Sequence, residues 1–190
     1  MSDGMGQTVA EKALSAHNLS GAAVRAGEGI DAAVDGLLVI NYHTIRAEYR
    51  RMGYPDGPPA VFDPARVFVM NEHVQPPRSV AMATGNRASR RDAERLGIEH
   101  FVESEPGVCH QMMLDRELVR PGQLVAGNDS HVTAYGGVNA AGFGVGALTP
   151  AGRVTLADHA VELIALAFPL FVVPGAGPVR HHRIDHQASG

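Results

Sequence analysis

The sequence predicts an α/β fold, a three-layer α/β/α arrangement around a mostly parallel sheet. Continuous apolar runs alternate along the chain with segments of helical character, which is typical of layered domains with parallel strands. These runs also contain few polar residues, as in strands that are covered on both faces. With 190 residues, of which 45% are hydrophobic, the chain is long enough for one good core.

The first half contains a helix, a strand and a second helix. The first helix is predicted at about residues 8–17, because Thr8 and Glu11 have the spacing of a capping box. Residues 36–41 form an apolar run that ends in a polar residue, and we expect a buried strand there. Residues 44–52 have a helical pattern, and a glycine and a proline follow as stop signals.

The second half continues the alternation of strands and helices. We expect a strand at 66–71, a charged helix at 79–96, a short strand at 98–102 and a fourth strand at 123–127. The charged helix is interpreted as a solvated face with helix-spaced charge pairs. The last 40 or so residues differ in character, and residues 154–173 are predicted as a helix or as a helix followed by a strand.

The composition argues against two classes of partner. The net charge is −4 and the basic residues do not cluster as they do in nucleic-acid-binding proteins. The longest apolar run, Leu163 to Val173, contains Pro169 and is shorter than the roughly 20 residues of a membrane helix. The N-terminus lacks the basic and apolar regions of a secretory signal. We therefore expect a cytoplasmic protein without a nucleic-acid or membrane partner.

Cys109 is the only cysteine of the sequence. A disulfide within the chain is therefore impossible, and a zinc or iron–sulfur site built from cysteines needs more thiolates than the chain has. Cys109 could be a catalytic thiol or a lone metal ligand, because it stands beside His110. A single cysteine is more often a small buried hydrophobe, and we expect that role here.

The most reactive side chains of the sequence lie in glycine-rich turns between residues 107 and 146. His110 follows one such turn, and Asp129, Ser130 and His131 follow the predicted strand at 123–127. Histidine and aspartate exchange protons near neutral pH, and loops of this kind often form binding sites. The sequence therefore predicts that these turns line a binding or active site.

A second acid–histidine pair, Glu72 and His73, comes directly after the predicted strand at 66–71. In open α/β sheets, ligands gather at the carboxyl ends of the strands. The carboxylate could orient the imidazole and favour its charged form. Neighbours on an extended chain point to opposite faces, so this pairing requires a turn. A solvated loop without function is the alternative.

Two other interpretations of these turns are less favoured. Ser130 could suggest a serine nucleophile, but catalytic triads are assembled from distant segments and no Gly-x-Ser-x-Gly motif is present. A hydrogen-bond donor to a carboxylate ligand is the preferred role of Ser130. The glycines at 136–146 lack both a dinucleotide-binding pattern and a Walker lysine, and we expect them to permit close backbone packing.

Together these segments resemble a known family. The motifs are Gly107 to Gln111, Pro121-Gly122, Gly127 to Thr133 with its Asn-Asp-Ser-His core, and the glycines from 136 to 146. They resemble the aconitase superfamily, in particular the large subunits of 3-isopropylmalate dehydratase and its homoaconitase-like relatives. The family's opening helix and its strand ending in an acid–histidine pair have counterparts upstream. The resemblance covers about residues 5–146, which we expect to form the first, α/β domain of such a protein.

The resemblance implies a hydro-lyase, which moves a hydroxyl group between adjacent carbons of a di- or tricarboxylic acid by dehydration and rehydration. It implies a [4Fe–4S] cluster with one open iron as a Lewis acid, and possibly a small swivelling-domain subunit as partner. Carried over by position, the resemblance implies that His73 with Glu72 lines the site and that His110 pairs with Asp129. It also implies that Ser130 forms a hydrogen bond with a substrate carboxylate and that His131 is a proton donor near the leaving hydroxyl.

The chain also departs from the family pattern. The family has Asp where Glu72 stands, and its cluster cysteines, serine base and substrate-binding arginines come from later segments that have no counterpart here. Residues 147–190 are atypical, and the last 15 or so are expected to be flexible. We therefore expect a truncated or frameshifted product that does not hold the cluster alone. The alternative is a non-catalytic carboxylate-binding or interaction module, or a degenerate fragment, that retains the fold.

Overall fold

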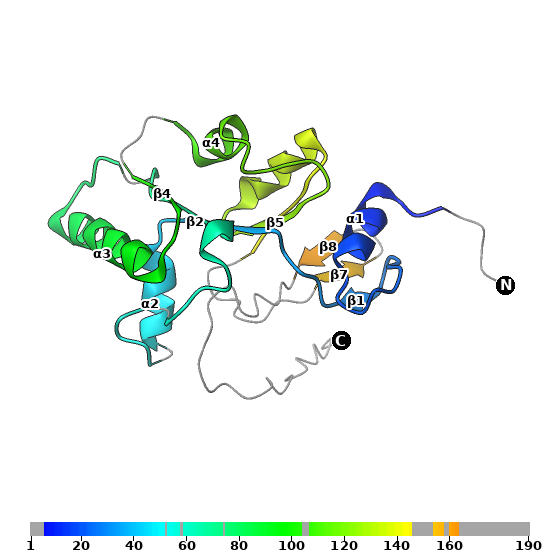
Figure 1. The fold of residues 1–190 in the computed structure, drawn as a ribbon, viewed down its shortest axis with the longest axis horizontal. Helices are drawn as coiled ribbons and strands as arrows, with labels where there is room; N and C mark the ends of the chain where they lie inside the picture. The colour runs from blue at the N-terminus through cyan, green and yellow to red at the C-terminus, as the bar shows by residue number, and fades with distance from the viewer. Residues whose placement is uncertain are drawn as a thin grey trace, which may run out of the picture.

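A computed structural model shows a parallel five-stranded sheet with helices on both faces (Figure 1). The structure describes residues 6–51, 53–57, 59–73, 75–103, 107–145, 154–157 and 160–163. The strand order is β4-β3-β2-β5-β6, and every neighbouring pair is parallel. The predicted fold class is thus confirmed. Its strands are β2 (Gly36–Ile40), β3 (Val67–Met70), β4 (His100–Val102), β5 (Leu124–Gly127) and β6 (Ala141–Gly144).

The chain order reverses direction in the middle of this sheet. From β2 the chain proceeds outward through β3 to β4, and it then returns to the other side of β2 for β5 and β6. Strands β2 and β5 are therefore neighbours at a topological switch point. In open α/β sheets the crevice for a ligand lies at the carboxyl ends of the strands at such a point.

The strands are buried on both faces because alternate residues join different cores. Leu37 and Val39 of β2 pack with α2 (His43–Arg51) and α3 (Val80–Leu96) on one face of the sheet. Leu38 and Ile40 pack on the opposite face. This period of two explains why the strands read as continuous apolar runs.

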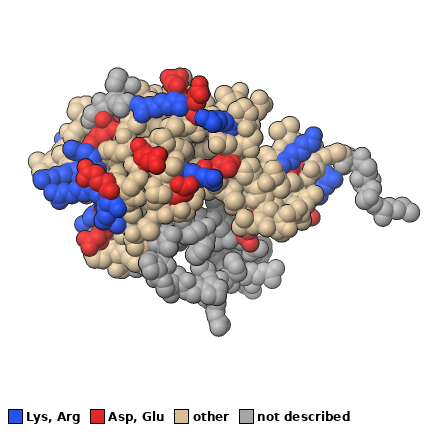
Figure 2. Space-filling view, viewed as in Figure 1, with Lys and Arg blue, Asp and Glu red and all other residues tan. Residues whose placement is uncertain are grey.

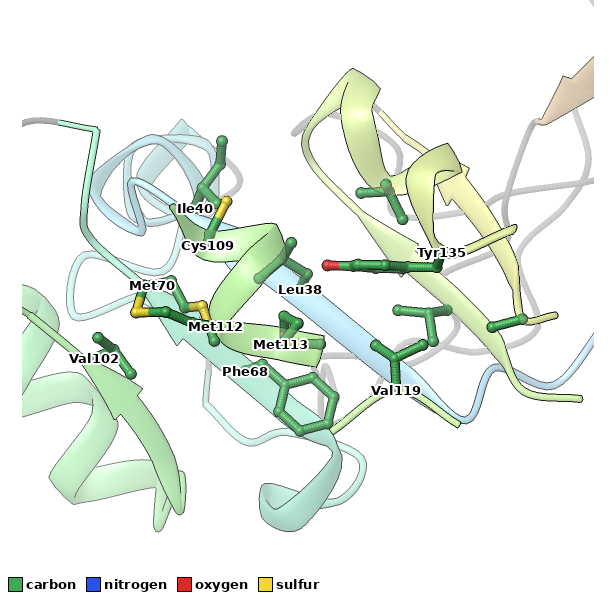
Figure 3. Packing of buried hydrophobic residues seen from close by; sticks show 13 residues of the cluster. Leu38, Ile40, Phe68, Met70, Val102, Cys109, Met112, Met113, Val119 and Tyr135 are labelled. Carbon is green, nitrogen blue, oxygen red and sulfur yellow. The ribbon is translucent and has the colours of Figure 1, made fainter. Parts of the chain in front are cut away.

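The opposite face is covered by α4 (Cys109–Asp115) and the 3-10 helix η2 (Ser130–Val138) (Figure 3). Met112 and Met113 of α4 are buried there against Leu38 and Phe68 of the sheet. The hydroxyl oxygen of Tyr135 points from η2 toward α4 in this view. The core thus joins the two segments that follow β4 and β5.

A separate small sheet and a helix accompany the main sheet. Helix α1 (Val9–His17) begins at a capping box in which Thr8 and Glu11 satisfy each other's backbone amides, as predicted. Leu14 of α1 packs against Leu124 of β5. The small antiparallel sheet has the order β1-β7-β8, with β1 (Gly29–Ile30), β7 (Val154–Ala157) and β8 (Ala160–Leu163). A helix was predicted at the start of residues 154–173. The structure has the strands β7 and β8 there instead.

The other predicted elements are confirmed within one or two residues. Several short elements of the structure were not predicted. The missed elements are β1, the short 3-10 helix η1 (Pro64–Arg66), α4, η2 and β6. The expected flexible tail lies outside the described residues. Among the described residues, no helix combines the length and apolar character needed to cross a membrane.

The interpretation of α3 as a merely solvated face was wrong in one respect. Asp92 is only 5% exposed, and its main partner is not on the same helix. The Nε of Arg46 on α2 donates to Asp92 Oδ2 at 2.7 Å, whereas the helix-spaced Arg95 lies 3.4 Å from Oδ1. The charge of Asp92 therefore joins two helices, which periodicity within one helix could not indicate.

Candidate active site

The predicted acid and histidine residues lie at the carboxyl ends of the central strands. The backbone there is fixed by Asn128, which follows β5 and bridges to the end of β2. Its side chain accepts from the Ile40 N–H at 2.7 Å and donates to the Ile40 carbonyl at 2.8 Å. This pair of bonds closes the switch point between β2 and β5 and places the next residue, Asp129, beside it.

Glu72 and His73 follow β3, and their side chains are in contact. His73 Nδ1 lies 2.7 Å from Glu72 Oε1, so the turn that this pairing requires is present. The same carboxylate oxygen accepts from the backbone N–H of Cys109 at 3.3 Å. The carboxylate is mostly buried, while His73 is exposed. Glu72 thereby ties the end of β3 to the start of α4.

His110 and Asp129 form the buried part of the site. His110 Nε2 donates to Asp129 Oδ1 at 2.8 Å, and the two side chains are 14% and 13% exposed. His110 lies in the first turn of α4, and Asp129 is the N-cap of η2. Two segments separated by a strand thus deliver one histidine–carboxylate pair.

The surroundings of Asp129 keep its carboxylate ionised. Burial raises the pKa of the Asp129 carboxyl, but the backbone N–H of His131 at 2.7 Å and the rings of His110 and His131 outweigh burial. The pKa therefore lies below its ordinary value. A carboxylate that stays charged can orient an imidazole and stabilise its protonated form.

His131 and Ser130 form the exposed part of the site. His131 Nδ1 lies 3.1 Å from Asp129 Oδ1 and 3.4 Å from Ser130 Oγ. The His131 side chain is 79% exposed, and no group of the described residues bonds to its Nε2. Its ring centroid is 6.0 Å from that of His110. Asp129 thus holds a buried and an exposed histidine with a single oxygen atom.

Tyr135 is a member of this cluster that the sequence did not indicate. Its hydroxyl lies 3.1 Å from His110 Nδ1, and its ring is completely buried in the core between η2 and α4 (Figure 3). Burial raises the pKa of the Tyr135 hydroxyl, so it stays protonated at neutral pH. A tyrosine five residues after an Asp-Ser motif carries no signal of its own, because only the packing of η2 against α4 brings it to His110.

Glycines allow the close contacts behind Asp129. A Cβ on Gly142 would lie 2.0 Å from the Val132 carbonyl oxygen, and one on Gly144 would lie 2.7 Å from that of Asp129. Strand β6 therefore lies directly against the start of η2. The prediction that these glycines permit close backbone packing is confirmed at both positions, whereas Gly136 and Gly137 have open space around them.

Cys109 is a buried hydrophobe, as predicted. It is fully buried in the core beneath α4, and burial raises the pKa of its thiol, with the Glu72 carboxylate adding to the rise. Its sulfur is nevertheless close enough to Glu72 and His73 for the three to surround a metal ion. The trio His110, Asp129 and His131 has the same property.

The structure thus brings the predicted site residues into two adjacent groups. His110, Asp129, Ser130 and His131 form one, and Glu72 with His73 forms the other. The two groups are joined because Glu72 bonds the backbone of Cys109, which precedes His110. We call these six residues and Tyr135 the carboxyl-edge site. Its acid–base groups and its exposed serine suit the binding and protonation of a small anionic ligand.

Comparisons with known proteins show the family to which the chain is similar. A model of the aconitase family (aconitate hydratase) matches residues 42–166. The homoaconitase large subunit of Thermus thermophilus is 39% identical over 143 residues, which are 75% of this chain and 33% of that protein. The 3-isopropylmalate dehydratase large subunit 1 of Methanopyrus kandleri is 36% identical over the same shares. That of Deinococcus radiodurans is 37% identical over 141 residues, 74% of this chain and 31% of the relative. The chain spans about a third of the length of these relatives.

Proposed function

Because the chain belongs to the aconitase family, we propose that its carboxyl-edge site takes part in a hydro-lyase reaction of the 3-isopropylmalate dehydratase large-subunit type. The substrate class is a hydroxy di- or tricarboxylic acid, which is dehydrated and rehydrated. The observation that carries this proposal is the cluster in which Asp129 Oδ1 holds both His110 and His131. A dehydration needs a proton for the departing hydroxyl, and this cluster can supply one.

His131 is proposed to deliver that proton. Its Nδ1 faces an ionised carboxylate, which orients the ring, and the other side of the exposed ring, with Nε2, faces outward. A proton on Nε2 is thus available to a ligand hydroxyl, while the ring is held in place from the other side. In rehydration the same nitrogen would take the proton back.

His110 is proposed to position this donor rather than to act as one. Both of its nitrogens are already engaged, with Asp129 at 2.8 Å and the Tyr135 hydroxyl at 3.1 Å. Its N–H···O bond fixes the Asp129 carboxylate, which in turn orients His131. The remaining roles follow from exposure. Ser130 Oγ would donate to a substrate carboxylate, and His73, held by Glu72, would line the ligand side.

The [4Fe–4S] cluster of the family does not fit the residues of this chain. Such clusters are held by several cysteine thiolates, and the 190 residues contain only Cys109. That thiol is fully buried and its pKa is raised, so it is a poor ligand as it stands. The chemistry proposed for the carboxyl-edge site is therefore limited to binding and proton transfer. A small subunit is a proposed partner, because the relatives are named as large subunits.

A second function is favoured by the same shortage of thiolates. The chain could bind a hydroxy di-acid at the carboxyl-edge site without turning it over, as a carboxylate-binding module. Ser130 and a protonated His131 would suffice for binding, since both can donate to a carboxylate.

Histidine ring resonances would test both functions. We would titrate the chain with 3-isopropylmalate, citrate and homocitrate and follow the Cε1–H signals of His110 and His131 by NMR. His17 serves as an internal control, because it is paired with Asp35 away from the site. We expect the His131 signal to shift in a saturable manner and the His17 signal to stay in place.

A turnover assay separates the two functions. The chain would be reconstituted anaerobically with iron and sulfide, alone and with a small subunit, and its dehydratase activity measured. Binding together with turnover supports the hydro-lyase, and binding without turnover supports the module. If no di-acid shifts the His131 signal, both assignments are wrong.

A further inference from the structure

The groove between α2 and α3 is lined by an unusual number of guanidinium groups. Its volume is about 490 Å³. Figure 2 shows blue side chains gathered with a few red ones over these two helices, at the left of the molecule. The arginines that line the groove are Arg46, Arg50, Arg87, Arg91 and Arg95. Among the described side chains, Asp56 and Asp92 are the carboxylates that line it with them, although the chain as a whole has a net charge of −4.

The spacing of these arginines is unfavourable without a ligand. Arg46 and Arg50 are four residues apart on α2, and Arg87 and Arg91 are four residues apart on α3. Like charges at this spacing repel each other on one face of a helix. Arg87 and Arg91 are exposed, and neither forms an ion pair with any residue that the structure describes. Their charge is therefore not neutralised within the described part of the chain.

Several groups of the groove are held by contacts with the rest of the chain. Asp92 is buried and orients Arg46 through a bond of 2.7 Å, and the Arg50 Nε donates to the Pro55 carbonyl at 3.0 Å. Gly57 has a φ of +83°, and a Cβ there would lie 3.0 Å from Asp92 Oδ2, so the loop packs tightly against this pair. Two guanidinium groups are thus fixed before any ligand arrives, which lowers the entropic cost of binding.

From these observations we infer that the α2–α3 groove binds a phosphate-bearing small molecule. Phosphate presents several oxygens to the forked donors of arginine, and bidentate pairs of this kind are strong and geometrically specific. The volume admits a molecule larger than a single phosphate. None of the groove residues belongs to the carboxyl-edge site, so this inference does not depend on the proposed function.

Calorimetric titration with inorganic pyrophosphate would test the groove in the full chain at low ionic strength. The variant Arg87→Ala/Arg91→Ala removes the two unpaired charges. The matched control is Arg66→Ala/Arg120→Ala, which removes two exposed arginines that do not line the groove. We expect saturable binding to the unmodified chain and to the control, and a dissociation constant raised on the order of tenfold to a hundredfold in the groove variant.

Three outcomes would overturn the inference. The first is the absence of saturable heat with pyrophosphate. The second is an equal loss of affinity in the groove variant and in the control, which would indicate a general effect of net charge. The third is binding of citrate at the groove as tight as that of pyrophosphate, which would show a site for any polyvalent anion and not for phosphate. Because all four arginines are exposed at the surface, we expect both variants to fold, and circular dichroism checks this.

Discussion

Two of the histidine–aspartate pairs among the described residues are mostly buried and almost equal in length, yet they lie in different surroundings. His17 Nε2 lies 2.7 Å from Asp35 Oδ2, and His110 Nε2 lies 2.8 Å from Asp129 Oδ1. Both rings are mostly buried, with 12% and 14% of their side chains exposed. The pairs differ in what the other groups of each residue contact. Distance and burial alone therefore do not distinguish a structural pair from a candidate site.

In the His17–Asp35 pair, the other contacts of both residues are with the backbone. His17 Nδ1 donates to the Ala13 carbonyl at 2.8 Å, and Asp35 Oδ2 also accepts from the Leu124 N–H at 2.8 Å. These partners connect α1 to the start of β5. The partners of the ring are a carbonyl oxygen, which can only accept, and a carboxylate that is already bonded to the backbone. The pair therefore connects elements of the fold and leaves neither ring nitrogen without a partner.

The His110–Asp129 pair has freedom that the other pair lacks. The partner of His110 Nδ1 is the hydroxyl of Tyr135, which can either donate or accept. His110 can therefore change its protonation state without losing a hydrogen bond. Asp129 also holds the exposed His131, whose Nε2 faces away from the carboxylate. An adaptable partner and an exposed second ring are the features on which we base the proposal that the carboxyl-edge site is the reactive one.

The largest difference between the pairs is expected in activity. Replacing His131 by asparagine removes the proposed proton donor but keeps a polar side chain. If the reconstitution assay yields dehydratase turnover, we expect this turnover to fall by about 10²–10⁴-fold, which is the usual contribution of a general acid. The variant His17→Asn should change turnover by less than about twofold while it lowers stability, because its pair is structural. Equal activity losses in both variants would remove the distinction.

A substitution behind the carboxyl-edge site should disturb one pair and leave the other. The variant Gly142→Ala places a Cβ against the Val132 carbonyl, which the backbone of η2 can relieve only by moving. We expect the free energy of unfolding to fall by about 1–3 kcal/mol, as measured by urea titration. In NMR spectra the ring signals of His110 and His131 should move, and that of His17 should not. As a control, Gly136→Ala has open space around it and should cost much less.

The hydroxyl of Tyr135 is the partner that makes His110 adaptable, and Tyr135→Phe removes it while keeping the buried ring. We expect stability to fall by about 1 kcal/mol, because His110 Nδ1 then has no partner in the cluster. The pH dependence of the His110 Cε1–H signal should change, and that of His17 should remain. A purely structural tyrosine would lower stability and leave the His110 titration as it was.

The smallest expected effect is the contribution of Asp129 to acid stability. Its pKa is lowered in the folded protein, so its contribution is present above the ordinary aspartate pKa and is lost as the pH falls below it. Urea titrations between about pH 3 and pH 6 should show stability falling toward acid. The fall should be shallower in Asp129→Asn than in the unmodified chain. Glu11 also has a lowered pKa and contributes to the fall in both proteins, so only the difference between them reports on Asp129.

The sequence by itself determined the layered fold and most of its long elements. Apolar runs such as residues 36–41 and 66–71 are strands because both faces of the sheet are covered, which leaves a signature that needs no tertiary information. The capping box of Thr8 and Glu11 is equally local. The order of strand, glycine turn and polar motif also placed Glu72, His73, Asp129 and His131 at strand ends, where the structure has them.

Only the tertiary structure decided which of these groups contact each other. Tyr135 reaches His110, Asp92 reaches Arg46 and His17 reaches Asp35 across separations of 25, 46 and 18 residues. No periodicity reports such contacts, because each depends on how two separate elements pack on the sheet. For the same reason the sequence could not tell the two histidine–aspartate pairs apart. The residue types specify which bonds are possible, and the packing decides which atoms are left free to react.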